Sequence, residues 1–94
     1  MRRVCVMPRD EEESNYEATR LALRRRVAMN ITELRIIRQL TQAELARRSG
    51  VTERELEDVE AGTGEMLIDT LSWVAVGLNV DITFLFRART DDVH

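Results

Sequence analysis

Five carboxylates surround a single arginine within a short stretch near the middle of the chain. The carboxylates are Glu53, Glu55, Glu57, Asp58 and Glu60, and the arginine is Arg54. At these intervals they alternate along a helix and do not converge as the ligands of a metal loop do. The only histidine is the last residue, His94, and no serine or cysteine lies beside a candidate base. We therefore expect no enzyme, no catalytic residue, no metal and no cofactor.

Start and stop signals place this cluster on the second of two short helices. Two capping boxes mark the helix starts, Thr41 with Glu44 and Thr52 with Glu55. Gly50 and Gly62 stand where each helix must end in a left-handed conformation, which costs little without a Cβ. Apolar residues recur on the inward side of both segments: Leu45, Ala46, Val51, Leu56 and Val59. The sequence thus predicts two helices packed at an angle around a turn.

A long helix is predicted before this pair and a further helix after it. The first runs from about Tyr16 to Arg38, because apolar residues recur at helical intervals without Gly or Pro: Tyr16, Leu21, Leu23, Val27, Ile31, Leu34 and Ile37. The later helix runs from Ile68 to Leu78, with an apolar face that we expect in the core: Ile68, Leu71, Val74, Ala75 and Leu78. Trp73 is expected in the core or at an interface.

The pattern after Asp81 changes to the alternation of a strand. Ile82, Phe84 and Phe86 point one way and Leu85 points the other. A lone strand cannot satisfy its own backbone, so we expect pairing with the same strand of a second copy, or with Val4–Met7. The predicted homodimer interface consists of Ile82, Phe84, Leu85 and Phe86.

Length and composition indicate one small domain with a divided charge. We expect a mobile arm or short strand over 1–15, a helical domain over 16–80, the dimerising strand over 81–89 and a tail over 90–94. The single cysteine, Cys5, and the lack of a membrane span or signal sequence predict a cytoplasmic protein. Residues 1–50 hold eleven Arg and seven acids, and 51–94 hold three Arg and ten acids. Attraction to phosphate would therefore come from the first helices.

The motif resembles the Xre-type helix-turn-helix family of lambda-repressor-like DNA-binding domains. The matching residues are Leu40-Thr41-Gln42, Glu44-Leu45-Ala46, Gly50-Val51-Thr52, Val59-Glu60, Gly62, Asp69-Thr70-Leu71 and Ala75 to Leu78. The resemblance covers roughly Ile31 to Val80. It implies an all-α, lambda-repressor-like bundle of about five helices, in which Thr52–Glu60 enters a major groove. It also implies that Gln42 touches DNA and that Glu60 pairs internally with Arg35 or Arg38.

On this basis we predict a sequence-specific transcription regulator that binds double-stranded operator DNA as a homodimer. The residues expected on the groove side are Gln42, Thr52, Glu53, Arg54, Glu57 and Asp58, with Arg47 and Arg48 near phosphates. Arg54 would contact guanine, and a carboxylate near the helix start would accept from cytosine N4.

Two alternatives follow from the acids on the second helix, which repel a polyanion. In one, the motif is a scaffold whose acidic face binds a basic protein, and DNA binding is weak or lost. In the other, the acidic face is merely solvated. The long helix, the motif and the terminal strand together also resemble the HigA-like antitoxins of toxin-antitoxin modules. That second resemblance implies a small ribonuclease toxin as a partner and repression of the protein's own operon.

Overall fold

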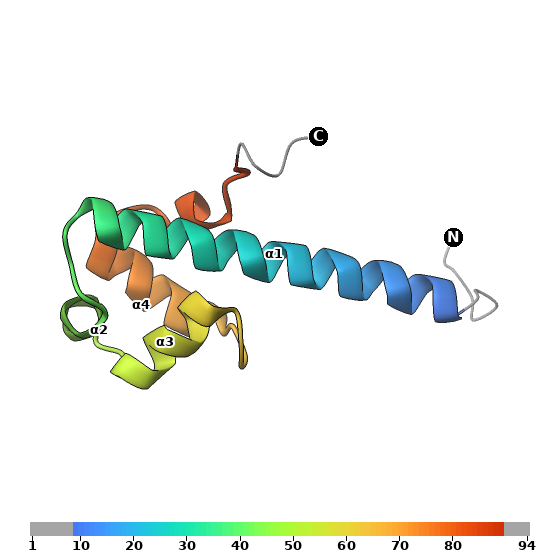
Figure 1. Ribbon diagram of the computed structural model, residues 1–94, viewed down its shortest axis with the longest axis horizontal. Helices are drawn as coiled ribbons and strands as arrows, with labels where there is room; N and C mark the ends of the chain where they lie inside the picture. Colours follow the sequence, from blue (N-terminus) through green and yellow to red (C-terminus); the bar gives the residue numbers. More distant parts are fainter. Residues whose placement is uncertain (1–8, 90–94) are drawn as a thin grey trace.

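Four α-helices and one short 3-10 helix make up the described part of the chain (Figure 1). The computed structural model describes the backbone of residues 9–89 and the side chains from residue 13 onward. The elements are α1 (Arg9–Ile37), α2 (Gln42–Ser49), α3 (Glu53–Ala61), α4 (Ile68–Leu78) and the 3-10 helix η1 (Ile82–Phe86). The all-α class is confirmed. A five-helix bundle is not, because the fifth element is a single 3-10 segment and not an α-helix.

The first helix is longer than predicted. It begins at Arg9, not near Tyr16, so the part of the expected N-terminal arm from 9 to 15 is helical. The sequence from Arg9 to Ile37 contains neither Gly nor Pro, and an acidic start favours the positive end of a helix dipole. The rest of that arm, residues 1–8 with the segment Val4–Met7, lies outside the described residues.

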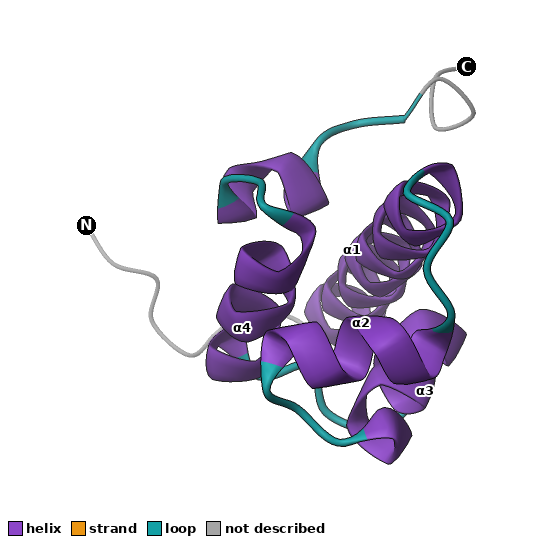
Figure 2. Cartoon of the chain, turned by 90° about the vertical axis from the view of Figure 1, so that its left-hand side faces the viewer, coloured by secondary structure: helices purple, strands orange, loops and turns teal. Residues whose placement is uncertain are grey.

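The helices α3 and η1 pack against the C-terminal half of α1, and α2 packs against α3 and α4; the N-terminal half of α1 extends beyond them (Figure 1). The view along the bundle shows α2 crossing in front, with α3 beneath it and α4 beside it (Figure 2). A 29-residue helix is about 43 Å long at 1.5 Å per residue. The longest dimension of the molecule, 49 Å, is therefore set mainly by α1.

The core is apolar and draws on every element. Its buried residues are Val27, Ile31, Leu45, Ala46, Leu56, Val59, Leu71, Val74, Ala75, Leu78 and Leu85. Most of the predicted inward positions of the motif are among them. The predicted inward face of the long helix is only partly correct, because Tyr16, Leu21, Leu23 and Ile37 are exposed. Ile68 and Trp73 are also exposed, since both lie on the outer side of α4.

The predicted C-terminal strand is wrong, because residues 82–86 form a 3-10 helix. Asp81 caps it by accepting from the backbone amide of Thr83 at 2.9 Å. Residues three apart share one side of a 3-10 helix, so Ile82 and Leu85 both turn toward the core. The strand was predicted from the alternation of Ile82, Phe84 and Phe86, whereas the three-residue spacing of Ile82 and Leu85 fits the 3-10 helix.

Three of the four residues assigned to a strand-paired dimer interface instead contribute to the core of their own chain. Leu85 is fully buried, and Ile82 and Phe86 pack against the core. Phe84 lies under the guanidinium of Arg87, which is 4.1 Å from the ring centre. These side chains therefore lack the strand by which they were expected to pair, and their role in an interface stays a prediction.

Polar contacts from α1 fasten the 3-10 helix in place. The buried side-chain amide of Asn30 donates to the carbonyl of Leu85 at 2.9 Å and to that of Arg87 at 3.0 Å. Arg89 donates to the carbonyl oxygen of the Asn30 side chain at 2.8 Å and to Glu33 at 3.0 Å. The carbonyls that end the 3-10 helix thus have partners on α1. Within residues 9–89 no helix has both the length and the apolar character to cross a bilayer.

Candidate nucleic-acid interface

Both predicted capping boxes are present, one at the start of α2 and one in the turn between α2 and α3. The hydroxyls of Thr41 and Thr52 each accept from a backbone amide three residues on at 3.0 Å. The carboxylates of Glu44 and Glu55 return the contact, each accepting from the threonine amide at 2.8 Å. Gly50 ends α2 with φ of 78°, in the left-handed region where a side chain is strained. This local chemistry fixes the start of α3 relative to α2.

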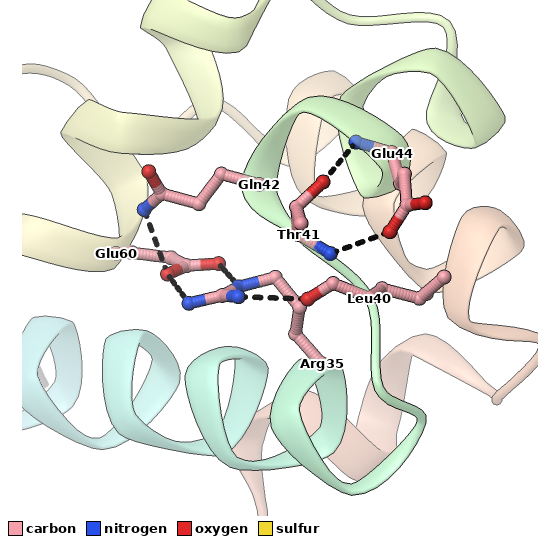
Figure 3. Close-up of polar contacts among 6 residues, drawn as sticks. All are labelled: Arg35, Leu40, Thr41, Gln42, Glu44 and Glu60. Atoms are coloured by element: carbon pink, nitrogen blue, oxygen red, sulfur yellow. Dashed lines mark hydrogen bonds and ion pairs between the residues drawn. The ribbon is translucent and has the colours of Figure 1, made fainter.

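A buried ion pair joins α3 to α1. Arg35 donates from Nε to Glu60 at 2.8 Å and from a terminal nitrogen to the other Glu60 oxygen at 3.1 Å, as Figure 3 shows. A further Arg35 nitrogen donates to the carbonyl of Leu40 at 2.8 Å. Both side chains are largely shielded from water. The predicted internal role of Glu60 is thereby confirmed, with Arg35 as its partner.

Gln42 belongs to the same network. Its side-chain nitrogen donates to Glu60 at 3.0 Å, so the side chain that was predicted to touch DNA also has a partner within the chain (Figure 3). Gln42 is the first residue of α2 and is only half-buried. The contact therefore fixes the amide at the start of α2, with its carbonyl oxygen left to accept a further bond.

The exposed face of α3 holds most of the residues predicted for the groove side. Thr52, Glu53, Arg54 and Glu57 are exposed, and Asp58 is partly exposed. Arg54 lies 3.7 Å from Asp58, one helical turn away. Such an exposed pair is weak, so the guanidinium of Arg54 can exchange this carboxylate for another acceptor. The structure thus brings these five together on one helix, while Gln42 lies near the opposite end of α3, at Glu60.

The acidic character of α3 is smaller than the sequence count indicates. Glu55 is committed to the capping box, and Glu60 is neutralised by Arg35. Asp58 has Arg54 beside it. Glu53 and Glu57 are the acids of α3 that the structure leaves exposed without one of these roles. The capping carboxylate of Glu55 keeps its charge, so α3 carries about −3 once Arg54 with Asp58 and Arg35 with Glu60 are counted as pairs.

Arginines on α2 add positive charge next to the motif. Arg47 and Arg48 are exposed in the last turn of α2, where a cation also suits the helix dipole. The pKa of Glu44 lies below its usual range because its carboxylate accepts from the backbone and hydroxyl of Thr41, and both arginines lower it further. Arg38, just after α1, is exposed as well.

Arg24 and Arg35, on one of the helices that were expected to attract phosphate, have structural roles. Arg24 donates to the carbonyl of Gly62 at 3.1 Å and also to that of Gly64, so it closes the end of α3. The sequence pattern did not predict this contact, because it joins residues about forty positions apart. In the described part of the chain, no group of three or more His, Cys, Asp or Glu side chains is placed to hold a metal ion.

Comparison with known proteins identifies a family model that matches the motif. The model of the HTH_3 family, described as helix-turn-helix, matches residues 31–85, which is more than half of the chain. None of the curated proteins compared with the chain matches it.

Solved structures of transcription regulators share the fold. An HTH_3 family transcriptional regulator from Vibrio cholerae aligns over 71% of this chain and 38% of its own, with 27% identity and a TM-score of 0.67. The present chain therefore spans well under half of that protein. The restriction-modification controller protein C.AhdI from Aeromonas hydrophila aligns over 69% of this chain and 98% of its own, with 26% identity and a TM-score of 0.66. The controller protein C.Esp1396I aligns over 68% of this chain and 83% of its own, with 25% identity and a TM-score of 0.63.

Proposed function

Because the chain belongs to the HTH_3, or Xre-type, helix-turn-helix family of DNA-binding transcription regulators, we propose that it binds a specific operator in double-stranded DNA. In this proposal the exposed face of α3 enters the major groove, and the protein acts in the cytoplasm as a homodimer. The observation that carries the proposal is the exposed face of α3, on which Arg54 lies. The Thr52 capping box fixes the start of this helix next to α2.

Base recognition falls to two side chains of opposite charge. Arg54 reaches guanine O6 and N7, and it releases Asp58 when it does so. Glu53, at the first position of α3, accepts from the amino group of cytosine. A carboxylate placed against guanine or thymine faces acceptors and is repelled, so the acids contribute to selectivity and subtract from affinity.

Phosphate contacts come from outside α3. Arg47 and Arg48 on α2, and Arg38 at the end of α1, are exposed and supply the attraction that α3 lacks. Gln42 contributes a fixed amide at the start of α2. Such contacts set the position of the domain on the duplex without reading its sequence.

A second candidate function is supported by Glu53 and Glu57. Both carboxylates face solvent and would meet phosphate unfavourably, whereas they complement a basic protein surface. In that case α3 is a protein-binding helix and DNA binding is weak. The HigA-like antitoxin hypothesis has less support, because it depended on the C-terminal strand, which is a 3-10 helix. A toxin partner therefore stays a prediction from the earlier resemblance.

The test is selection of bound fragments from genomic DNA, followed by affinity measurement on the enriched fragment and a scrambled duplex. Wild-type protein should prefer the enriched fragment. Arg54→Ala should reduce that preference by about 5- to 150-fold, since a good base contact contributes about 1–3 kcal/mol. The matched control Arg48→Ala should weaken both duplexes alike. Failure to enrich any fragment would favour the protein-binding alternative.

A further inference from the structure

Among the described residues, no other helix covers the part of α1 that precedes Arg20. None of the described residues between 13 and 26 is buried, and the first fully buried residue of α1 is Val27. Figure 1 shows this half projecting beyond the other helices. A solitary helix of this length is marginal in water, because most helical stability comes from packing one face. The projecting half therefore needs a surface to cover it.

One face of the projecting half continues the apolar stripe of the core. Tyr16, Arg20, Leu23 and Val27 follow one another at intervals of four, three and four residues, which places them on one side of a helix. Val27 is fully buried, whereas Leu23 is 40% exposed and Tyr16 is 66% exposed. The stripe thus leaves the bundle and emerges into solvent.

A cavity lies where this stripe leaves the bundle. Its volume is about 350 Å³, and its wall includes Arg20 and Leu23 of α1. The opposite wall is apolar and comes from Met66, Ile68 and Phe86. Each chain therefore carries a projecting aromatic side chain and, two helical turns further along the same face, a cavity with mostly apolar walls.

The charges of α1 make this face complementary to itself in one direction only. On one flank of this face Glu13 and Glu17 lie toward the N-terminal end, and Arg20 and Arg24 follow them, with Arg24 also donating to the carbonyls of Gly62 and Gly64. Two copies placed antiparallel bring the acids of each against the arginines of the other, whereas a parallel arrangement opposes like charges. An isologous contact of this kind closes at two copies.

We propose that α1 is the dimerisation element, with the face formed by Tyr16, Arg20 and Leu23 packed against the same face of a second, antiparallel copy. Arg20 and Glu17, which are 3.0 Å apart, lie near the two-fold axis. Tyr16 of each copy lies opposite Leu23 of the other and enters the cavity there. This deepens the homodimer of the proposed function by naming its surface, and it is measured without DNA, so the two can fail separately.

The exposed face of α4 is the competing surface. Trp73 and Val76 are exposed there, but neither lines the cavity beside the apolar stripe of α1. The variant Trp73→Glu therefore distinguishes the two surfaces, because it should weaken the dimer only if α4 forms the interface.

Sedimentation of the full chain tests the proposal. Wild type should have twice the chain mass of 10.9 kDa, and Tyr16→Glu and Leu23→Glu should each weaken the dimer by at least about tenfold. The matched control is Leu21→Glu, which changes a leucine of 55% exposure on another side of the same helix and should leave the dimer intact. Circular dichroism of each variant checks that the fold is retained.

Cross-linking tests the position of the axis. In a Cys5→Ser background, Arg20→Cys should form a disulfide between copies under mild oxidation, while Ala18→Cys, on the opposite face, should not. A wild-type chain that stays monomeric overturns the proposal. So does a dimer that resists Leu23→Glu and yields to Trp73→Glu.

Discussion

Glu60 at the end of α3 and Arg35 near the end of α1 form a two-bond ion pair, with the shorter contact at 2.8 Å and a side-chain exposure of only 5% for Glu60. The same carboxylate accepts from Gln42 at the start of α2. One carboxylate thus ties together the three helices that present the candidate DNA surface. The position of the Glu60 carboxylate therefore depends on Arg35 and Gln42, which are far from it in the sequence.

Arg35→Ala should destabilise the domain by about 3 kcal/mol, because it leaves a shielded carboxylate without its cation. The measurement is the free energy of unfolding from urea denaturation. Arg35→Ala combined with Glu60→Gln should cost less than the two single changes added together, since the stranded charge is gone. Arg54→Ala, which breaks the exposed pair with Asp58, should change stability by less than about 1 kcal/mol. Equal costs for the two arginines would contradict the structural role of Glu60.

Reversing the charge of the two outward acids of α3 should raise the affinity for any DNA and lower the preference for the enriched fragment. Glu53→Arg with Glu57→Arg should raise binding to a scrambled duplex by more than tenfold at low salt, because two repulsive charges become attractive. The preference for the enriched fragment should fall at the same time. Glu65→Arg with Asp69→Arg makes the same charge change outside α3 and should raise scrambled-duplex binding less. Unchanged affinity after reversal on α3 would mean that this helix does not face DNA.

Stability should fall with acid partly through Glu44. The Thr41 contacts hold the pKa of Glu44 below its usual range in the folded chain, so the folded state favours the ionised carboxylate. That contribution is present above the usual glutamate pKa of about 4.3 and is lost as the pH falls through the lower folded value. Glu44→Gln should therefore flatten the fall in thermal midpoint below about pH 5. A slope identical to that of wild type would contradict the capping contact.

Gly77 is needed where α4 meets α2. A Cβ added there would lie 2.1 Å from the hydroxyl oxygen of Ser49 and 3.1 Å from its Cα. Gly77→Ala should cost about 1–3 kcal/mol in unfolding free energy, since an overpacked contact forces helices apart. Ser49→Ala should recover part of that loss, because the buried hydroxyl has no hydrogen-bond partner among residues 9–89 to lose. Gly77→Ala with wild-type stability would show that this helix contact is loose.

The motif itself was predictable because its signals are local. Capping boxes, glycines after each helix and apolar spacing act within a few residues, and each of the two caps has the predicted partners. Glu55 shows this: its capping role was recognised from the sequence, and the structure has both predicted bonds between Glu55 and Thr52.

The ends of the chain were harder to predict because their structure depends on distant contacts. Alternating apolar residues after Asp81 fit a strand, but Asn30 on α1 supplies donors to the carbonyls of Leu85 and Arg87 and so favours the 3-10 helix. The sequence pattern also predicted an inward face along the whole length of α1. Because α1 extends beyond the bundle, Tyr16 and Leu23 lie on that face but are exposed.

The most direct test of DNA recognition by α3 is the salt dependence of binding to the enriched fragment and to a scrambled duplex. We expect selective binding whose affinity falls steeply as salt rises, since Arg38, Arg47 and Arg48 displace counterions from phosphate. The preference for the enriched fragment should persist while both affinities fall, because base contacts release few counterions. Absence of binding to either duplex at low salt, or binding without preference at every salt concentration, would contradict it.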